Sequence, residues 1–155
     1  METDQPTGGD RRRGKRARTP SAGLDPRTPA AFVDSSAIVA LVDRDDATHA
    51  AAVEAYRSLV ADGYRLFTTN HVVVETYDLL AAGVGVGVAR RWLRDMRLAI
   101  YTTEEEDEEK ARRMVATADS KRALTLTDAI SIVVMERLGV GDAFAVDPDF
   151  LAALS

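Results

Sequence analysis

From about residue 31 onward, short apolar runs alternate with longer segments whose apolar residues recur at helical spacing. Strands are predicted at four such runs, Ala31–Val33, Tyr64–Thr69, Leu98–Thr102 and Asp142–Val146. Helices are predicted over 37–42, 51–60, 71–82, 88–96, 104–118 and 128–138, with a short final helix after residue 147. This alternation is typical of a three-layer α/β/α sandwich around a mainly parallel sheet.

Polar residues and glycines mark the expected ends of these helices. Ser35 or Ser36 is expected to cap the helix over 37–42, and Thr127 to cap the helix that begins at Asp128. Gly139 and Gly141 should end that last helix. In the helix over 71–82, four residues are expected to face the core: Val72, Tyr77, Leu79 and Leu80.

Two segments have a biased composition: one is rich in glycine and the other is acidic. Gly83–Gly87 resembles a phosphate-binding loop, but it follows a predicted helix instead of a strand, which favours a helix end and a loop. The acidic run Glu104–Glu109 suits the first turn of a helix, where negative charge interacts well with the helix dipole. We therefore predict a solvated helix start there, with a metal site as the alternative.

The composition fits one globular domain plus a tail. The chain has 155 residues, of which 46% are hydrophobic. There is no cysteine, so disulfides, thiolate zinc sites and cysteine nucleophiles are excluded. No apolar run approaches the roughly 18 residues of a membrane helix. A cytoplasmic protein that does not engage a membrane is the expectation.

Charge divides the chain into two parts. Residues 1–30 carry a net charge of +3 and residues 31–155 a net charge of −8. We predict that 1–30 is a disordered basic N-terminal tail and that 31–155 is the folded domain. The tail is either a nucleic-acid contact or simply solvated. The acidic domain disfavours nonspecific nucleic-acid binding through a broad basic surface.

Four acidic residues lie at the end of a predicted strand or within a predicted helix: Asp34, Glu75, Asp128 and Asp147. Ligands of open α/β sheets bind at the carboxyl ends of the strands. Buried carboxylates are costly unless a partner or a metal compensates them, and oxygen ligands suit Mg²⁺ or Mn²⁺. A divalent-metal site is therefore predicted. Each acid also has a structural alternative, as a turn cap, a helix-dipole partner or a solvated side chain.

A divalent ion at such an edge would polarise a phosphoryl oxygen, and phosphodiester hydrolysis is the natural use of that chemistry. The two histidines, His49 and His71, lie near helix starts without the context of a Ser–His–Asp triad. They are predicted to be capping or packing residues.

Five segments of this chain resemble the motifs of PIN-domain ribonucleases, and most closely those of VapC-type toxins from bacterial toxin–antitoxin pairs. They are Phe-Val-Asp-Ser-Ser-Ala (32–37), the stretch over 42–49, Thr-Thr-Asn-His-Val-Val-Val-Glu-Thr (68–76), Leu-Thr-Leu-Thr-Asp-Ala-Ile-Ser (124–131) and Ala-Phe-Ala-Val-Asp-Pro-Asp-Phe (143–150). The resemblance covers about residues 31–152, with the motifs in the order typical of that family.

The resemblance implies a Mg²⁺- or Mn²⁺-dependent endoribonuclease. It assigns the catalytic and metal-binding roles to the acids Asp34, Glu75, Asp128 and Asp147. It adds a hydroxyl at Thr127, a water-orienting Ser131 and, as a supplementary acid, Asp149. Ser35 stands where the family has a small polar residue.

The same resemblance implies partners. These are an RNA substrate, often structured RNA such as transfer or ribosomal RNA, a cognate antitoxin, and a second copy of the chain in a homodimer. The antitoxin would insert a segment near the acids, where an arginine suits carboxylate geometry. Arg90, Arg94 and Arg97 recur at helical spacing and are candidate RNA contacts. The alternative is a solvated face on which Arg91 pairs with Asp95.

Two other classes of protein are alternatives to a nuclease. A non-catalytic PIN-like module that binds RNA or protein is the main alternative, although the complete set of acids argues against it. A phosphoaspartate phosphatase or receiver domain would use Asp34 as a nucleophile. Such proteins need an Asp-x-Asp after the first strand or a lysine near the last one, and Asp34-Ser35-Ser36 and Val146-Asp147 provide neither.

Overall fold

The computed structural model describes residues 28–119, 121 and 123–155. Most of the predicted tail lies outside these residues. Four parallel strands form one sheet: β1 (Ala30–Val33), β2 (Arg65–Thr69), β3 (Ala99–Tyr101) and β4 (Asp142–Phe144). Their order is β3-β2-β1-β4, and every neighbouring pair is parallel. The carboxyl ends of all four strands therefore meet at one edge of the sheet.

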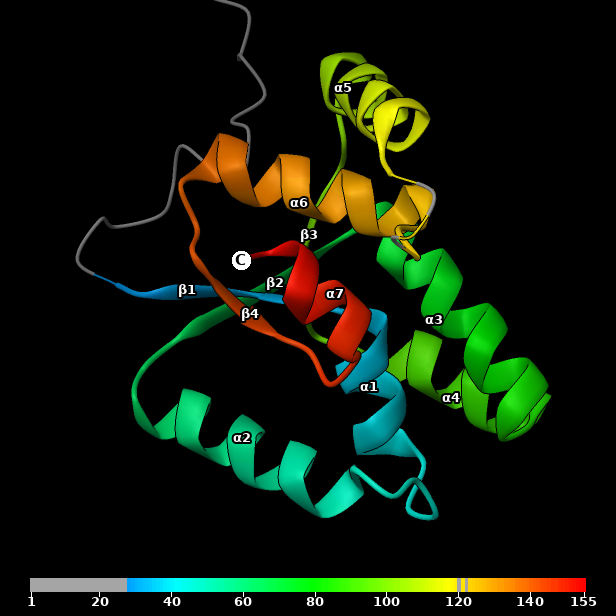
Figure 1. Ribbon diagram of the computed structural model, residues 1–155. Coiled ribbons are helices and arrows are strands. Elements are labelled where there is room, and N and C mark those ends of the chain that lie inside the picture. Colours follow the sequence, from blue (N-terminus) through cyan, green and yellow to red (C-terminus); the bar gives the residue numbers. More distant parts are fainter. Residues whose placement is uncertain (1–27, 120, 122) are drawn as a thin grey trace, which may run out of the picture.

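Helices cover both faces of this sheet, as the predicted three-layer sandwich requires (Figure 1). The helices α1 (Ser35–Val42) and α2 (His49–Ala61) lie on one side, and α5 (Glu105–Thr117) and α6 (Leu126–Leu138) on the other. The helices α3 (Asn70–Gly83) and α4 (Val86–Asp95) form a hairpin beside the carboxyl ends of the strands. The short α7 (Pro148–Ala153) follows β4. The predicted fold class is confirmed.

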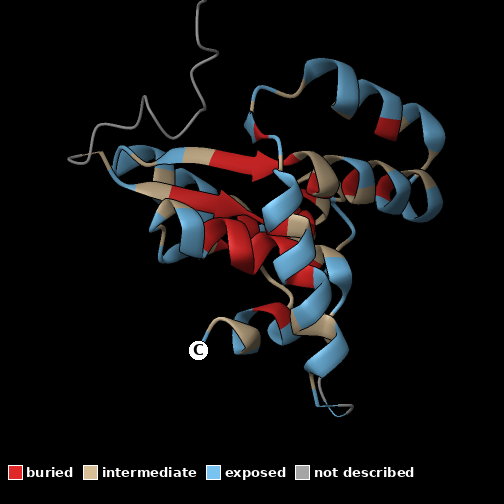
Figure 2. Ribbon diagram, turned by 90° about the horizontal axis from the view of Figure 1, so that it is seen from above, coloured by how far each residue is buried: buried red, intermediate tan, exposed pale blue. Residues whose placement is uncertain are grey.

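The core forms between the central strands and helices packed on them (Figure 2). The ring of Phe32 on β1 meets that of Phe67 on β2 edge to face, with centroids 5.8 Å apart, and lies 6.1 Å from that of Phe150 on α7. Residues Ala129–Met135 of α6 are all buried. This burial fixes α6 against the sheet, and with it the position of Asp128 in the first turn.

Helix starts differ from the sequence prediction in two places. Asp34 itself caps α1, which begins at Ser35, so neither serine is the cap. Thr125, not Thr127, caps α6: its hydroxyl oxygen accepts from the N–H of Asp128 at 3.0 Å. The Asp128 carboxylate accepts from the Thr125 N–H at 3.4 Å in return. This reciprocal pair satisfies two free backbone donors, which is why the earlier threonine is preferred.

The hairpin of α3 and α4 shows what the prediction of core residues missed. Val72 and Leu80 are buried and Tyr77 is half-buried, but Leu79 is 47% exposed. Gly83 ends α3, and Gly85 precedes α4 with a φ of +146°, a conformation that favours glycine. The glycine-rich segment is thus a helix end and a loop, as predicted.

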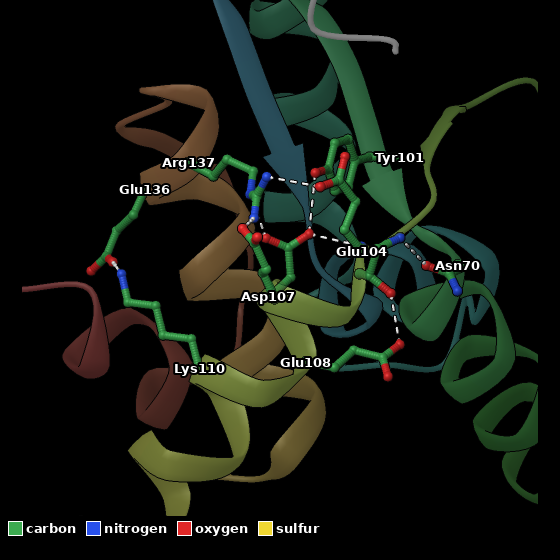
Figure 3. A network of polar contacts seen from close by, with 10 residues as sticks. Asn70, Tyr101, Glu104, Asp107, Glu108, Lys110, Glu136 and Arg137 are labelled. Atoms are coloured by element: carbon green, nitrogen blue, oxygen red, sulfur yellow. Dashed lines mark hydrogen bonds and ion pairs between the residues drawn. The ribbon is translucent and has the colours of Figure 1, made fainter. Parts of the chain in front are cut away.

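The acidic start of α5 is only partly solvated, which corrects the prediction for Glu104–Glu109. Asp107 is buried, and its Oδ1 forms an ion pair with Nε of Arg137 on α6 at 2.5 Å (Figure 3). Its Oδ2 accepts from the N–H of Glu104 at 2.9 Å and from the hydroxyl of Tyr101 at 3.1 Å. Burial, together with the negative charge of Asp107, raises the pKa of Tyr101 to about 12. These contacts join β3, α5 and α6.

Within the described part of the chain, no helix is long and apolar enough to cross a membrane.

Candidate active site

Asp34 follows β1 at the carboxyl edge of the sheet. Its N–H donates to the carbonyl of Phe144 on β4 at 3.0 Å, and its side chain is 2% exposed. Oδ2 accepts from the N–H of Ser36 at 3.1 Å and from its hydroxyl at 2.5 Å. Oδ1 is buried and has no hydrogen-bond partner among the described residues. One oxygen is therefore held in place, while the other remains available to a ligand.

Ser36 connects this acid to the last candidate acid. Its hydroxyl oxygen accepts from the backbone N–H of Val146 at 3.1 Å and from that of Asp147 at 3.2 Å. One side chain thus holds the Asp34 carboxylate and the start of the chain segment after β4. Sequence reasoning treated Ser36 only as a possible helix cap. The usable signal was a hydroxyl two residues after a strand-end aspartate.

Glu75 reaches the same region from α3. This helix begins directly after β2, where the Thr69 hydroxyl caps it by accepting from the N–H of Val72 at 3.2 Å. The Glu75 carboxylate accepts a short hydrogen bond from the hydroxyl of Ser35. Ser35 and Ser36 therefore each hold one carboxylate at the start of α1.

Asp128 completes a group of three interacting acids. It is 7% exposed in the first turn of α6. Burial raises its pKa to about 6; hydrogen bonds from Thr125 oppose that shift, and the charges of Asp34 and Glu75 add to it. Burial also raises the pKa of Asp34, with hydrogen bonds from Ser36 opposing and the charge of Glu75 adding. Negative charge is thus concentrated at this edge.

Asp147 has a different environment. Its Oδ1 accepts from the N–H of Asp149 at 3.0 Å, so the side chain caps α7. The hydroxyl of Ser36 connects it to Asp34, because this hydroxyl donates to the Asp34 carboxylate and accepts from the backbone N–H of Asp147. In the positions that the structure describes, no three histidine or acidic side chains are close enough together to hold a metal ion. The structure therefore groups Asp34, Glu75 and Asp128 electrostatically, and does not close a ligand set around them.

The grouped acids nevertheless fit a hard divalent cation in their chemistry. A buried carboxylate oxygen without a partner is costly, and the mutual repulsion of the three acids adds to that cost. A cation with oxygen ligands relieves both penalties. The residues that would hold it are Asp34, Glu75 and Asp128, with Asp147 at the adjoining start of α7.

Two of the predicted supporting residues, Thr127 and Ser131, lie on α6, and the third, Asp149, lies on α7. Thr127 is half-buried and lines, together with Glu75, a cavity of about 590 Å³. Ser131 is buried, and its hydroxyl donates to the carbonyl of Thr127 at 3.0 Å. Asp149 is exposed and lines a separate cavity of about 700 Å³ between α5, α6 and α7. That cavity contains none of the four acids.

The arginines of α4 are all exposed, and so is Arg97 just after the helix. Arg94 forms an ion pair with Asp95 at 2.9 Å, so the predicted partner of Asp95, Arg91, is replaced by its immediate neighbour. Arg97 donates to the backbone carbonyls of Asp95 and Met96 at 3.3 and 3.2 Å.

Both histidines make local contacts. Nδ1 of His49 lies 2.7 Å from the carbonyl oxygen of Ala40, next to the start of α2. Nε2 of His71 lies 2.9 Å from a carboxylate oxygen of Glu108 and 3.1 Å from the hydroxyl of Thr103. These polar contacts join elements: His49 connects α2 to α1, and His71 connects α3 to Thr103 and to α5.

Comparison with known proteins gives the family of this chain. The family model described as PIN domain matches residues 31–153. This chain belongs to the PIN-domain family. Curated relatives from two strains of Mycobacterium tuberculosis, CDC 1551 / Oshkosh and H37Rv, are each named 23S rRNA-specific endonuclease VapC20. Each is 33% identical over 127 residues, which cover 79% of this chain and 92% of the relative.

A solved structure is similar as well. The crystal structure of M. tuberculosis VapC20, described as a sarcin-ricin loop cleaving toxin, matches with a TM-score of 0.69 and 31% identity. The match covers 79% of this chain and 94% of that chain. The predicted resemblance to PIN-domain, VapC-type proteins is thereby confirmed.

Proposed function

We propose that this protein is a divalent-metal-dependent endoribonuclease and the toxin of a type II toxin–antitoxin pair. The observation that carries the proposal is the group formed by Asp34, Glu75 and Asp128 at the carboxyl edge of the sheet. The group occurs in a PIN-domain chain that is 33% identical to a 23S rRNA-specific endonuclease. Burial and mutual repulsion of carboxylates are tolerated where a cation and a phosphate are to be bound.

Mg²⁺ or Mn²⁺, when bound, supplies positive charge that polarises a phosphoryl oxygen of the RNA backbone. The chain's own contribution is to fix the acids. Ser36 holds one oxygen of Asp34 and leaves the other free. Ser35 orients Glu75, and the capping box of α6 orients Asp128. Such preorganisation lowers the cost of assembling a charged site.

Asp147 is the proposed fourth acid, and it would leave its capping contact with Asp149 to join the others. Thr127 and Ser131 support Asp128 from the first turns of α6. Asp149 is the supplementary acid of the proposal. These four assignments rest on the family motifs at 124–131 and 143–150.

The proposed substrate is a structured RNA, by analogy with the ribosomal RNA named for the relatives. Because residues 31–155 carry a net charge of −8, affinity cannot come from a broad basic surface. The exposed side chains of Arg90, Arg94 and Arg97 are the proposed phosphate contacts. In this proposal, Arg94 exchanges Asp95 for a phosphate oxygen, since both are acceptors of the same geometry.

The proposed partners are a cognate antitoxin and a second copy of this chain, and the proposed location is the cytoplasm, where ribosomal RNA is found. An arginine of the antitoxin would neutralise the acidic group in place of the metal, because a guanidinium pairs with carboxylates in two hydrogen bonds.

The test is cleavage of a synthetic hairpin RNA with the sarcin-ricin loop sequence, alongside a pool of total RNA. Wild type, Asp128→Asn and the matched control Asp62→Asn are compared with Mn²⁺ and with EDTA. Asp62 is an exposed acid at the end of α2. Discrete fragments that require the metal and Asp128, but not Asp62, support the proposal. Intact RNA in every reaction with wild type and Mn²⁺ would instead favour a PIN-like binding module.

A further inference from the structure

A cavity of about 590 Å³ lies along α3 and shares one wall with the acidic group. Its lining residues are Asn70, His71, Val74, Glu75, Asp78, Leu79 and Thr127. On α3, positions 71, 74, 75 and 78 fall at helical spacings of three and four, so they form one stripe. The stripe starts at the carboxyl edge of the sheet and leads outward from Glu75.

The charges in this cavity disfavour a phosphate. Two lining residues are acidic, Glu75 and Asp78, and none of the seven is a lysine or an arginine. The cavity also presents apolar surface, because Val74 is 63% and Leu79 is 47% exposed. An unpaired nucleobase can pack against apolar side chains while its edge meets hydrogen-bonding groups.

Polar groups in the cavity can contact the edge of a base. The amide oxygen of Asn70 accepts from the N–H of Thr103 at 3.1 Å (Figure 3), which orients the amide with its NH₂ group as a donor. The imidazole of His71 is held by Glu108 and Thr103. The exposed carboxylate of Asp78 is an acceptor. The cavity therefore offers a donor at Asn70 and an acceptor at Asp78 beside the apolar side chains of Val74 and Leu79.

We propose that this cavity binds one unpaired nucleobase of the RNA, next to the phosphate that the acidic group engages. Asp78 accepts a hydrogen bond from an exocyclic amino group of that base, as carboxylates do with the amino group of cytosine. Uracil, which lacks such an amino group, is disfavoured. This inference rests on the proposed function, because the RNA is the source of the base.

Binding is measured first, in a background that does not depend on cleavage. The Asp128→Asn protein is titrated against hairpin RNAs in which each loop nucleotide in turn is made abasic. At one position, removal of the base is expected to weaken binding roughly tenfold, the scale of one base–side chain contact. Adding Asp78→Ala, which removes the acceptor, should weaken binding of the intact RNA to a similar extent, and should weaken binding of that abasic RNA no further. Asp62→Ala is the matched control.

In the Asp128→Asn protein, replacing the base at that position by uracil should weaken binding to a similar extent, and adding Asp78→Ala should then weaken it no further. Equal sensitivity of every abasic RNA to Asp78→Ala would overturn the proposal. So would an Asp78→Ala variant that binds all RNAs normally but changes its sedimentation coefficient, because the cavity would then belong to a protein interface.

The two proposals can fail separately. If wild-type protein cleaves no RNA while the base-dependent binding and its loss in Asp78→Ala are observed, the cavity is supported and the nuclease is not. If metal-dependent cleavage requires Asp128 but no single base matters for binding, the nuclease stands and the cavity proposal is overturned.

Discussion

Asp128 destabilises the metal-free fold when it is ionised, because it is buried beside two other acids. Its pKa in the folded protein is about 6, above the ordinary value of 3.8, so the folded state holds the proton more tightly than the unfolded chain. The stabilisation from protonation is fully present below about pH 3.8 and is lost as the pH rises through 6. A salt-bridged carboxylate has the opposite pH dependence, because its pKa is lowered on folding and its stabilisation is lost as the pH falls.

Asp128→Asn should remove most of this pH dependence. At pH 7 without metal, the variant should be more stable than wild type by about 1–2 kcal/mol, a value reduced from the full shift for partial solvent screening. A smaller decline remains, because the pKa of Asp34 is also raised. Urea denaturation from pH 4 to pH 8 gives the comparison. A variant less stable than wild type at pH 7, with an unchanged pH profile, would refute this description of the site.

At the scale of single residues, the sequence placed the predicted acids at strand ends and in helices, but it gave no sign of the residues that hold them. Carboxylates at strand ends are visible because the apolar runs before them are visible. The double role of Ser36 depends on the segment at Val146 and Asp147, which is more than 100 residues away in sequence. The capping pair of Thr125 and Asp128 was readable as a Thr-x-x-Asp pattern, but Thr127 stood closer to the expected helix start.

At the scale of elements, α5 and α6 are joined through the buried carboxylate of Asp107. It receives an ion pair from Arg137 and hydrogen bonds from Glu104 and Tyr101. The alternation of apolar and polar residues predicted both helices, but an acidic run gives no sign of which acid turns inward. That choice follows from Arg137, which lies 30 residues further along the chain and on the facing helix.

Asp107→Ala should lower the free energy of unfolding by about 3 kcal/mol, because it leaves Arg137 and the Glu104 N–H without their buried acceptor. The matched variant is Glu106→Ala, which removes another carboxylate that pairs with Arg137 at 3.2 Å. The Glu106 side chain is 84% exposed, so its loss should leave stability almost unchanged. Equal effects of the two changes in urea denaturation would contradict a buried clamp.

At the scale of the whole molecule, the regular alternation of strands and helices was enough to predict the fold class. The strand order β3-β2-β1-β4 was not predictable from that alternation. This order places Asp34 between the ends of β2 and β4, and the packing of α3 and α6 then brings Glu75 and Asp128 toward it. Asp147 lies at the start of α7, where its carboxylate accepts from the N–H of Asp149.

The most direct test of the site is a calorimetric titration of Mn²⁺ into wild type and into single variants of each acid, at pH 7.5. We expect saturable binding to wild type and to Asp62→Asn. We expect at least a tenfold weaker affinity in Asp34→Asn, Glu75→Gln and Asp128→Asn, and a smaller loss in Asp147→Asn. Binding of the same strength in wild type and in the three principal variants would contradict the account, because the metal would then lie elsewhere.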